Sequence, residues 1–234
     1  MTRRHRHAIL QSSQVRCATV SETNLEPELQ QHLQRLLTSA PDSPASRLLD
    51  DARRLWHRVQ RLIELNLTPP ELDRETMELA CHALQLPDRT GKPVGKLGQV
   101  NLRERAEQAA ELLISSLSDH ADDQLIDRAT MLLRELPLRS PKLPEAKLLA
   151  DAVNLDDFGL TGLLLQAMQL ARQHASVTAV VQGFVKRQQY GYWEARLKDG
   201  FHFEPIRQMA RQRLQATQQA ISLLLAELQE DQSL

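Results

Sequence analysis

The sequence is poor in aromatic residues and in glycine. Only 3% of its 234 residues are aromatic, and it contains eight glycines. Sandwiches and barrels rely on aromatic and β-branched strands joined by glycine-rich turns, so this composition argues against them. Leucine, alanine, glutamine, glutamate and arginine dominate instead, and all of them favour helices. We therefore predict an all-α protein, long enough to bury a core without disulfides.

Cysteine, net charge and long apolar runs are also scarce. Cys17 and Cys81 are far apart and match no metal or redox spacing, which favours a reducing, cytoplasmic compartment. A formal net charge of −1 gives no reason to expect nucleic acid as a partner. The longest apolar runs, near Leu160–Leu165 and Leu223–Leu225, are too short to span a bilayer, so we expect no membrane partner.

The composition divides the chain into two segments, 1–45 and 46–234. The first begins with a basic tail that has no acidic residue before Glu22. This tail fits either a frayed terminus or an organelle-targeting segment, and it lacks the apolar stretch of a secretory signal. A short helix is expected at Glu26–Thr38, and the Pro- and Ser-rich stretch Ser39–Ser46 reads as a linker.

In the second segment, 46–234, apolar residues recur at the spacing of an α-helix in one stretch after another. Helices are expected over Arg47–Asn66 and Thr68–Leu86, from Asn101, from Asp122 or Asp123, from Pro144, over Leu160–His174, from Ser176, and over Glu204–Leu228. We therefore expect a bundle of about eight helices. The segment Leu160–His174 is apolar almost all round, which predicts the central buried helix.

The stretch Pro144–Gly159 carries the strongest single pattern. Proline suits the first helical position, and Glu145 favours the first turn through the helix dipole. One face of this helix is apolar, formed by Leu148, Leu149, Ala152 and Leu155. Asp151 lies beside that face. A carboxylate so close to a core is either paired or a ligand.

This stretch resembles the late helix of the HD-domain metal-dependent phosphohydrolases, with the pattern E-A-x-L-L-x-D-A-D-x-L-D-x-x-G. The resemblance implies an HD-like helical bundle, metal-assisted hydrolysis of phosphate esters, and Asp151 as a metal ligand. Val153 stands where the family has a second aspartate. The pair Arg58-Val59 resembles the end of the family's H-x-x-R-V, and Arg207–Arg211 nearly matches its R-x-x-A-x-x-R.

The resemblance fails at the family's remaining metal-binding positions. Its first histidine falls on Leu55, and the His-Asp pair falls on Leu84 and Gln85. The nearest imidazoles, His57 and His82, are each displaced by two residues. Two helical steps rotate a side chain by roughly 200°, so we expect both imidazoles to face away from the core. The His-Asp pair is therefore predicted to be lost.

Two further groups are candidates for binding. Five aromatic residues lie close together near the last helix: Tyr190, Tyr192, Trp193, Phe201 and Phe203. They fit either a packed corner that holds the terminal helix or a pocket for a ligand or partner. Three basic residues, Lys147, Arg207 and Arg211, are candidates to contact a phosphate group, although charged residues on long helices also serve solvation.

The leading hypothesis is a degenerate HD-fold protein that binds a ligand, a nucleotide or another protein, without hydrolysis and without a cofactor. Its partner would be a protein or a phosphate-containing small molecule, and homo-oligomer formation stays open. Asp151 would then be held by hydrogen bonds or by Lys147, beside Leu55 and Leu84.

Two alternatives remain open. One is an active phosphohydrolase that holds a divalent metal through displaced ligands: His57, His82, Asp151 and Asp156. The other is a helical regulatory module that acts through the aromatic corner, namely Trp193, Tyr192, Phe201 and Phe203.

Overall fold

The computed structural model describes residues 23–39, 47–65, 71–90, 101–172 and 174–232, and these ranges are helical without a strand. The all-α prediction is confirmed. The basic tail, most of the linker Ser39–Ser46 and the expected helix start at Thr68 lie outside the described residues. Across the described ranges, none of the helices has both the length and the apolar character that crossing a bilayer requires.

The described residues form ten α-helices and two short 3-10 helices, more than the eight helices expected. In chain order they are α1 (Pro27–Thr38), α2 (Arg47–Glu64), α3 (Arg74–Ala83), η1 (Leu86–Thr90), α4 (Leu102–Leu117), α5 (Asp123–Glu135), α6 (Pro144–Asn154), η2 (Leu155–Asp157), α7 (Leu160–Arg172), α8 (Val177–Gln189), α9 (Tyr192–Asp199) and α10 (Glu204–Gln232).

The helix starts follow from side chains that accept otherwise unpaired main-chain N–H groups. The Asn101 side chain accepts the N–H of Arg103 at 3.2 Å, and the Ser176 hydroxyl accepts the N–H of Ala179 at 3.2 Å. Pro144 occupies the first turn of α6, as predicted. α3 begins later than expected, at Arg74, because Asp73 provides its cap.

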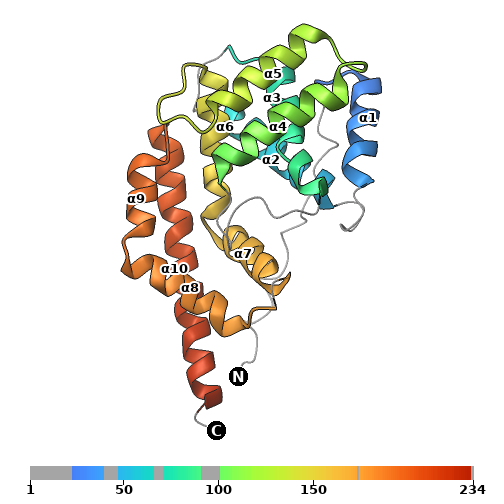
Figure 1. The fold of residues 1–234 in the computed structure, drawn as a ribbon. Coiled ribbons are helices and arrows are strands. Elements are labelled where there is room, and N and C mark those ends of the chain that lie inside the picture. Colours follow the sequence, from blue (N-terminus) through green and yellow to red (C-terminus); the bar gives the residue numbers. More distant parts are fainter. Residues whose placement is uncertain (1–22, 40–46, 66–70, 91–100, 173, 233–234) are drawn as a thin grey trace, which may run out of the picture.

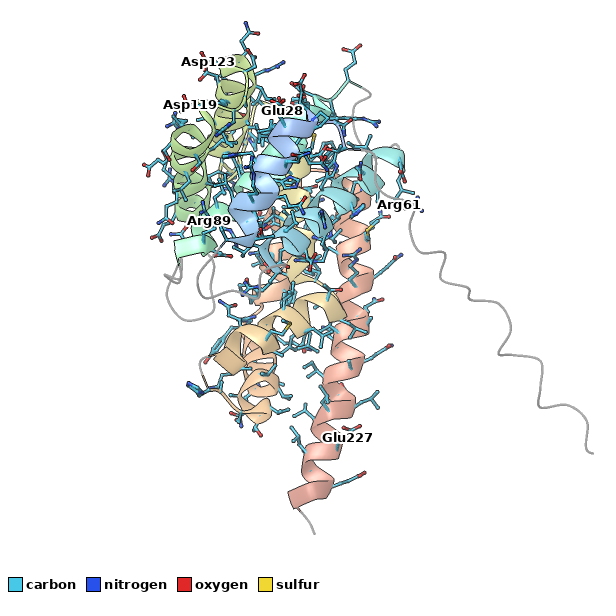
Figure 2. The ribbon with its side chains drawn as sticks, turned by 90° about the vertical axis from the view of Figure 1, so that its right-hand side faces the viewer. Glu28, Arg61, Arg89, Asp119, Asp123 and Glu227 are labelled. Atoms are coloured by element: carbon cyan, nitrogen blue, oxygen red, sulfur yellow. The ribbon has the colours of Figure 1, made fainter. Side chains whose placement is uncertain are left out.

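Helices α1 to α6 form one part of the molecule, and α7 to α10 lie against its end (Figure 1). One continuous apolar core runs through both parts. α1 packs on α2 and η1, with Leu29, Leu33 and Leu37 buried in that core. α10 is the longest helix, and Figure 2 shows it extending past the other helices toward Glu227.

The central buried helix is α3, not the predicted Leu160–His174. Every residue from Thr76 to Ala83 is buried, because α2, α4, α5 and α6 all pack around α3. α7 packs on η2, α8 and α10 and leaves one face open. On that face Leu160, Leu164 and Met168 are 50%, 64% and 53% exposed. Apolar composition alone did not distinguish burial from an open face.

Two polar residues inside α3, Glu78 and His82, are buried, and hydrogen bonds to both of them stabilise this burial. The carboxylate of Glu78 accepts the Thr23 hydroxyl at 2.8 Å and the Asn24 main-chain N–H at 2.7 Å. His82 Nδ1 lies 2.9 Å from the Glu78 carbonyl oxygen. Buried polar groups are tolerated where hydrogen bonds replace water, so the segment before α1 is fixed onto the central helix.

Candidate functional site

Asp151 lies on α6 and is completely buried. Its Oδ1 accepts the main-chain N–H of His202 at 2.8 Å, and its Oδ2 accepts that of Phe203 at 2.9 Å. The Phe203 carbonyl accepts the N–H groups of Ile206 and Arg207 in the first turn of α10. A carboxylate at this place also interacts favourably with the helix dipole. Asp151 therefore caps α10 from a different helix.

The environment of Asp151 affects its protonation in opposing ways. Burial raises the pKa of the Asp151 carboxyl to about 7, while the two N–H bonds and the charge of Arg207 act to lower it. The predicted hydrogen bonding of Asp151 is found. Its partners, however, are main-chain groups more than fifty residues away in sequence, and no hydrogen bond joins it to Lys147 among the described residues.

Asp156, in η2, is bound by two arginines of α2. Its Oδ1 lies 2.5 Å from Arg54 Nη1 and 2.5 Å from Arg58 Nη2. Arg58 also donates through Nη1 to the Ala152 carbonyl at 3.1 Å. Arg58 of the Arg58-Val59 pair thus joins α2 to the end of α6, and Asp156 is its salt-bridge partner.

A second polar group fixes α9 to the same segment. Arg196 donates to Asn154 Oδ1 at 2.9 Å and to Asp157 Oδ2 at 2.5 Å. Asn154 in turn donates through Nδ2 to the Gly200 carbonyl at 2.5 Å. We call Asp151, Asn154, Asp156 and Asp157, with their partners, the α6 joint. It connects the end of α6 to α2, to α9 and to the start of α10.

The positions that the resemblance assigns to metal ligands carry no imidazole. Leu55 and Leu84 are buried, at 4% and 2% exposure. Gln85 Oε1 accepts a hydrogen bond from Arg105 Nη2 at 2.9 Å. His57 is exposed on the opposite side of α2 from Leu55, as the rotation predicts.

The expectation that His82 faces away from the core is wrong, because α3 is enclosed on all sides and His82 is only 6% exposed. Burial lowers the pKa of its imidazole. The displaced ligands are therefore not brought together: His57 is on the surface, His82 is bonded within α3, and Asp156 is held by arginines. Within the described ranges, no group of three His, Cys, Asp or Glu side chains is placed to hold a metal ion.

The aromatic corner is packed. Trp193 is 3% exposed and contacts the rings of Phe158 and Phe184 at centroid distances of 5.4 Å and 5.2 Å. Phe201 lies edge-on to Phe158 at 5.4 Å, and Tyr192 lies edge-on to Trp193 at 5.0 Å. The burial of Trp193 fits the packed corner, the first of the two alternatives, and Phe158 and Phe184 are additional members of this cluster. Among the predicted aromatics, Phe203 is partly buried and Tyr190 is 85% exposed.

The three basic candidates lie in different surroundings. Arg207 forms an ion pair with Glu204 and donates to the Phe201 carbonyl at 2.7 Å, so it fixes the turn before α10. Arg211 is exposed, and Lys147 is half-exposed. Arg213, a further arginine near the start of the same helix, is half-buried and close enough to Arg58 for their charges to interact. No local signal marks it, because its neighbours come from α2 and η2.

The α6 joint can hold helices in place and present charged groups, but it does not collect the donors that metal-assisted chemistry needs. Its carboxylates are bound by main-chain N–H groups and guanidinium groups. No protein-family model, no curated protein and no solved structure matches this chain.

Proposed function

We propose that this chain is a degenerate HD-like helical domain that acts by binding rather than by hydrolysis. The observation that carries the proposal is the bonding of Asp151, the residue that the resemblance assigns to the metal. Both of its carboxylate oxygens accept main-chain N–H groups, from His202 and Phe203. A carboxylate that caps a helix in this way has a structural use that requires no metal.

The neighbouring sequence positions support the same proposal. Metal-assisted hydrolysis needs several nitrogen and oxygen donors that converge on one point. Leu55 and Leu84 offer none, and the amide oxygen of Gln85 is already bound by Arg105. A single carboxylate does not hold a catalytic ion in place against water. Asp151 without these partners is therefore better suited to fix α10 than to catalyse hydrolysis.

The alternative is a phosphohydrolase whose metal is held by His57, His82, Asp151 and Asp156. It would require Asp156 to leave Arg54 and Arg58, and exposed His57 to reach the buried side of α2. Both changes would disrupt contacts that join α2 to η2. The binding proposal requires no such rearrangement.

Metal analysis beside a phosphate-release assay tests the proposal. The full chain, Asp151→Asn and the exposed control Asp119→Asn are incubated with Mg²⁺, Mn²⁺ or Co²⁺, desalted and analysed for bound metal. The same samples are assayed with a general phosphate monoester. We expect no stoichiometric metal and no release above background in any of the three. Metal and activity that are present in the wild type, kept in Asp119→Asn and lost in Asp151→Asn would overturn the proposal.

The open face of α7 favours a second candidate, a module that binds another protein. Leu160, Leu164 and Met168 lie at four-residue steps and are each at least half exposed. The stretch Leu160–Ala171 contains no charged residue. Contiguous exposed apolar surface is typical of interaction sites. The aromatic corner, by contrast, is largely buried, so α7 is the better candidate surface.

Self-association is the simplest form of this second candidate to test. Light scattering over a wide concentration range would show whether the wild type gains mass that Leu164→Asp does not. A wild type that stays monomeric at the highest concentration would exclude α7 as a homo-oligomer interface.

A further inference from the structure

We propose that Arg54, Arg58 and Arg213 together bind a phosphate-type oxyanion where α2, η2 and α10 meet. The inference rests on the proposed binding function and names a ligand class for it. The evidence for it is a local excess of positive charge that the described carboxylates do not neutralise.

The first observation is that two guanidinium groups share one acceptor. Arg54 and Arg58 both donate to Oδ1 of Asp156, each at 2.5 Å. One carboxylate supplies one negative charge, so it cannot neutralise both arginines. Each guanidinium has five N–H donors in a planar fork. The shared oxygen, together with Asp51 for Arg54 and the Ala152 carbonyl for Arg58, satisfies only some of them. Donors therefore remain for a further acceptor.

The second observation is that the surrounding charges keep the excess positive. Among the described residues, the other acid in contact with this group is Asp51, which pairs with Arg47 at 3.5 Å and with Arg54 at 3.1 Å. Asp157, next to Asp156 in sequence, is already paired with Arg196. Within the described ranges, the group Arg47, Arg54, Arg58 and Arg213 thus faces only two carboxylates, those of Asp51 and Asp156.

The third observation is that Arg213 shares the charge of Asp156 with two other arginines and has no ion pair of its own among the described residues. Its side chain runs along Gly159, where an added Cβ would lie 3.2 Å from Arg213 Cβ. Among the described residues, its guanidinium has no hydrogen bond and no ion pair within 4.0 Å. Burial and the charge of Arg58 lower the pKa of Arg213, while Asp156 raises it less. A half-buried, unpaired cation beside another cation is costly, and an anion would relieve that cost.

The group is open to solvent on one side. Arg54 and Asp156 keep 32% and 22% of their side chains exposed, and Arg58 keeps 11%. Guanidinium groups bind phosphate and carboxylate oxygens through parallel N–H donors, and phosphate offers the charge of nearly two units that this group lacks. We therefore assign the site to a phosphate ion or to the phosphate of a monoester.

Calorimetric titration of the full chain tests the site. The probes are inorganic phosphate, sodium chloride at matched ionic strength, and AMP as a monoester. The variants are Arg213→Gln and, as a matched control on the same helix, the exposed Arg211→Gln. We expect phosphate to bind the wild type and Arg211→Gln alike. Arg213→Gln should bind about tenfold more weakly or worse, because a charge-assisted contact is lost.

Arg213→Lys covers the case in which Arg213→Gln fails to fold, since lysine keeps the charge but not the forked donors. It should bind more weakly than the wild type and more tightly than any folded Arg213→Gln. AMP that binds more tightly than phosphate would identify the source as an ester, and equal or weaker binding would identify the free ion. The inference is overturned if phosphate binds no better than chloride, or if both Arg213 variants bind like the wild type.

The phosphate-release assay on the same samples separates this inference from the proposed function. No release together with no phosphate binding would overturn the site and leave the non-hydrolytic proposal standing. Release of phosphate from the ester would overturn the non-hydrolytic proposal, whatever the titration gives.

Discussion

Oδ2 of Asp151 accepts the main-chain N–H of Phe203 at 2.9 Å, across a sequence separation of 52 residues. The carboxylate of one helix therefore completes the N-terminus of another. Caps are usually local, provided by a residue just before the helix. Here the capping group comes from the middle of α6, so the position of α10 depends directly on α6.

Removal of the Asp151 carboxylate should destabilise the protein without affecting any metal. Asp151→Ala leaves two N–H groups without their acceptor beside the core, which should cost about 2–4 kcal/mol in the free energy of unfolding. Asp151→Asn keeps one acceptor oxygen and should cost less. Urea unfolding followed by circular dichroism measures both.

The exposed Asp119→Ala is the control for this prediction and should lie within about 0.5 kcal/mol of the wild type. An Asp151→Ala protein as stable as this control would contradict the capping role.

Truncation of Trp193 should be among the most damaging single changes. Trp193 is 3% exposed and packs against Phe158 and Phe184, so Trp193→Ala should lose about 3–5 kcal/mol of stability. Tyr190→Ala, three residues away and 85% exposed, should change stability by less than about 0.5 kcal/mol. Thermal unfolding compares the two, and equal melting temperatures would mean that the corner is not a packing element.

The different burial of α3 and α7 can be tested with one aspartate in each helix. Leu79, on α3, is fully buried, whereas Leu164, on α7, is 64% exposed. Leu79→Asp places an unpaired charge in the core and should abolish folding or cost more than about 4 kcal/mol. Leu164→Asp should fold with stability near that of the wild type. Equal loss in both variants would place α7 in the core, as its composition alone had predicted.

Acidification should weaken the attachment of α1. His32 and His120 stack with ring centroids 3.7 Å apart, between α1 and the turn after α4. Burial, and then the charge of His120, lower the pKa of His32 below its ordinary 6.5. As the pH falls, His32 therefore binds a proton more readily in the unfolded chain than in the folded protein. The contribution of neutral His32 to the stability of the folded protein is therefore complete above pH 6.5. It is lost as the pH falls from 6.5 toward the lower pKa that His32 has in the folded protein.

Comparison of the wild type with His32→Gln isolates this effect. The difference in unfolding free energy should shrink from about pH 7.5 to about pH 5.5. The exposed control His57→Gln should stay within about 0.5 kcal/mol of the wild type. Asp151 acts in the opposite sense: with its pKa raised from 3.8 to about 7, it favours the folded state less as the pH rises between those values. It is present in all three proteins, so it cancels. A difference that is independent of pH would refute the role of the stack.

Local features of the sequence predicted most of the helices. Asn101, Ser176 and Pro144 act where they were expected, because capping depends on residues only two or three positions away. The burial of whole helices was harder to predict. α3 contains Glu78 and His82 yet is central, and α7 is almost wholly apolar yet half open, because burial depends on how many helices surround each one.

The candidate site was predictable only in part. The stripe beside Asp151 indicated a carboxylate that is either paired or a ligand, but its partners are main-chain groups of a turn that no side-chain pattern reveals. The surroundings of Arg213 were not predicted for the same reason, since they are Gly159 and, through its charge, Arg58 of α2. Contacts of this kind join residues that are far apart in the sequence, so they cannot be identified until the fold is known.

The length of α10 gives the contacts at its start a mechanical consequence. Its 29 residues span about 43 Å, and it is held near one end by Asp151 while the other end extends past Glu227. A tilt of about 5° at the held end would displace the far end by about 4 Å. α7 and α8 pack along this helix and would travel with it. α10 is therefore a lever, and any group that shifts its first turns moves the open face of α7.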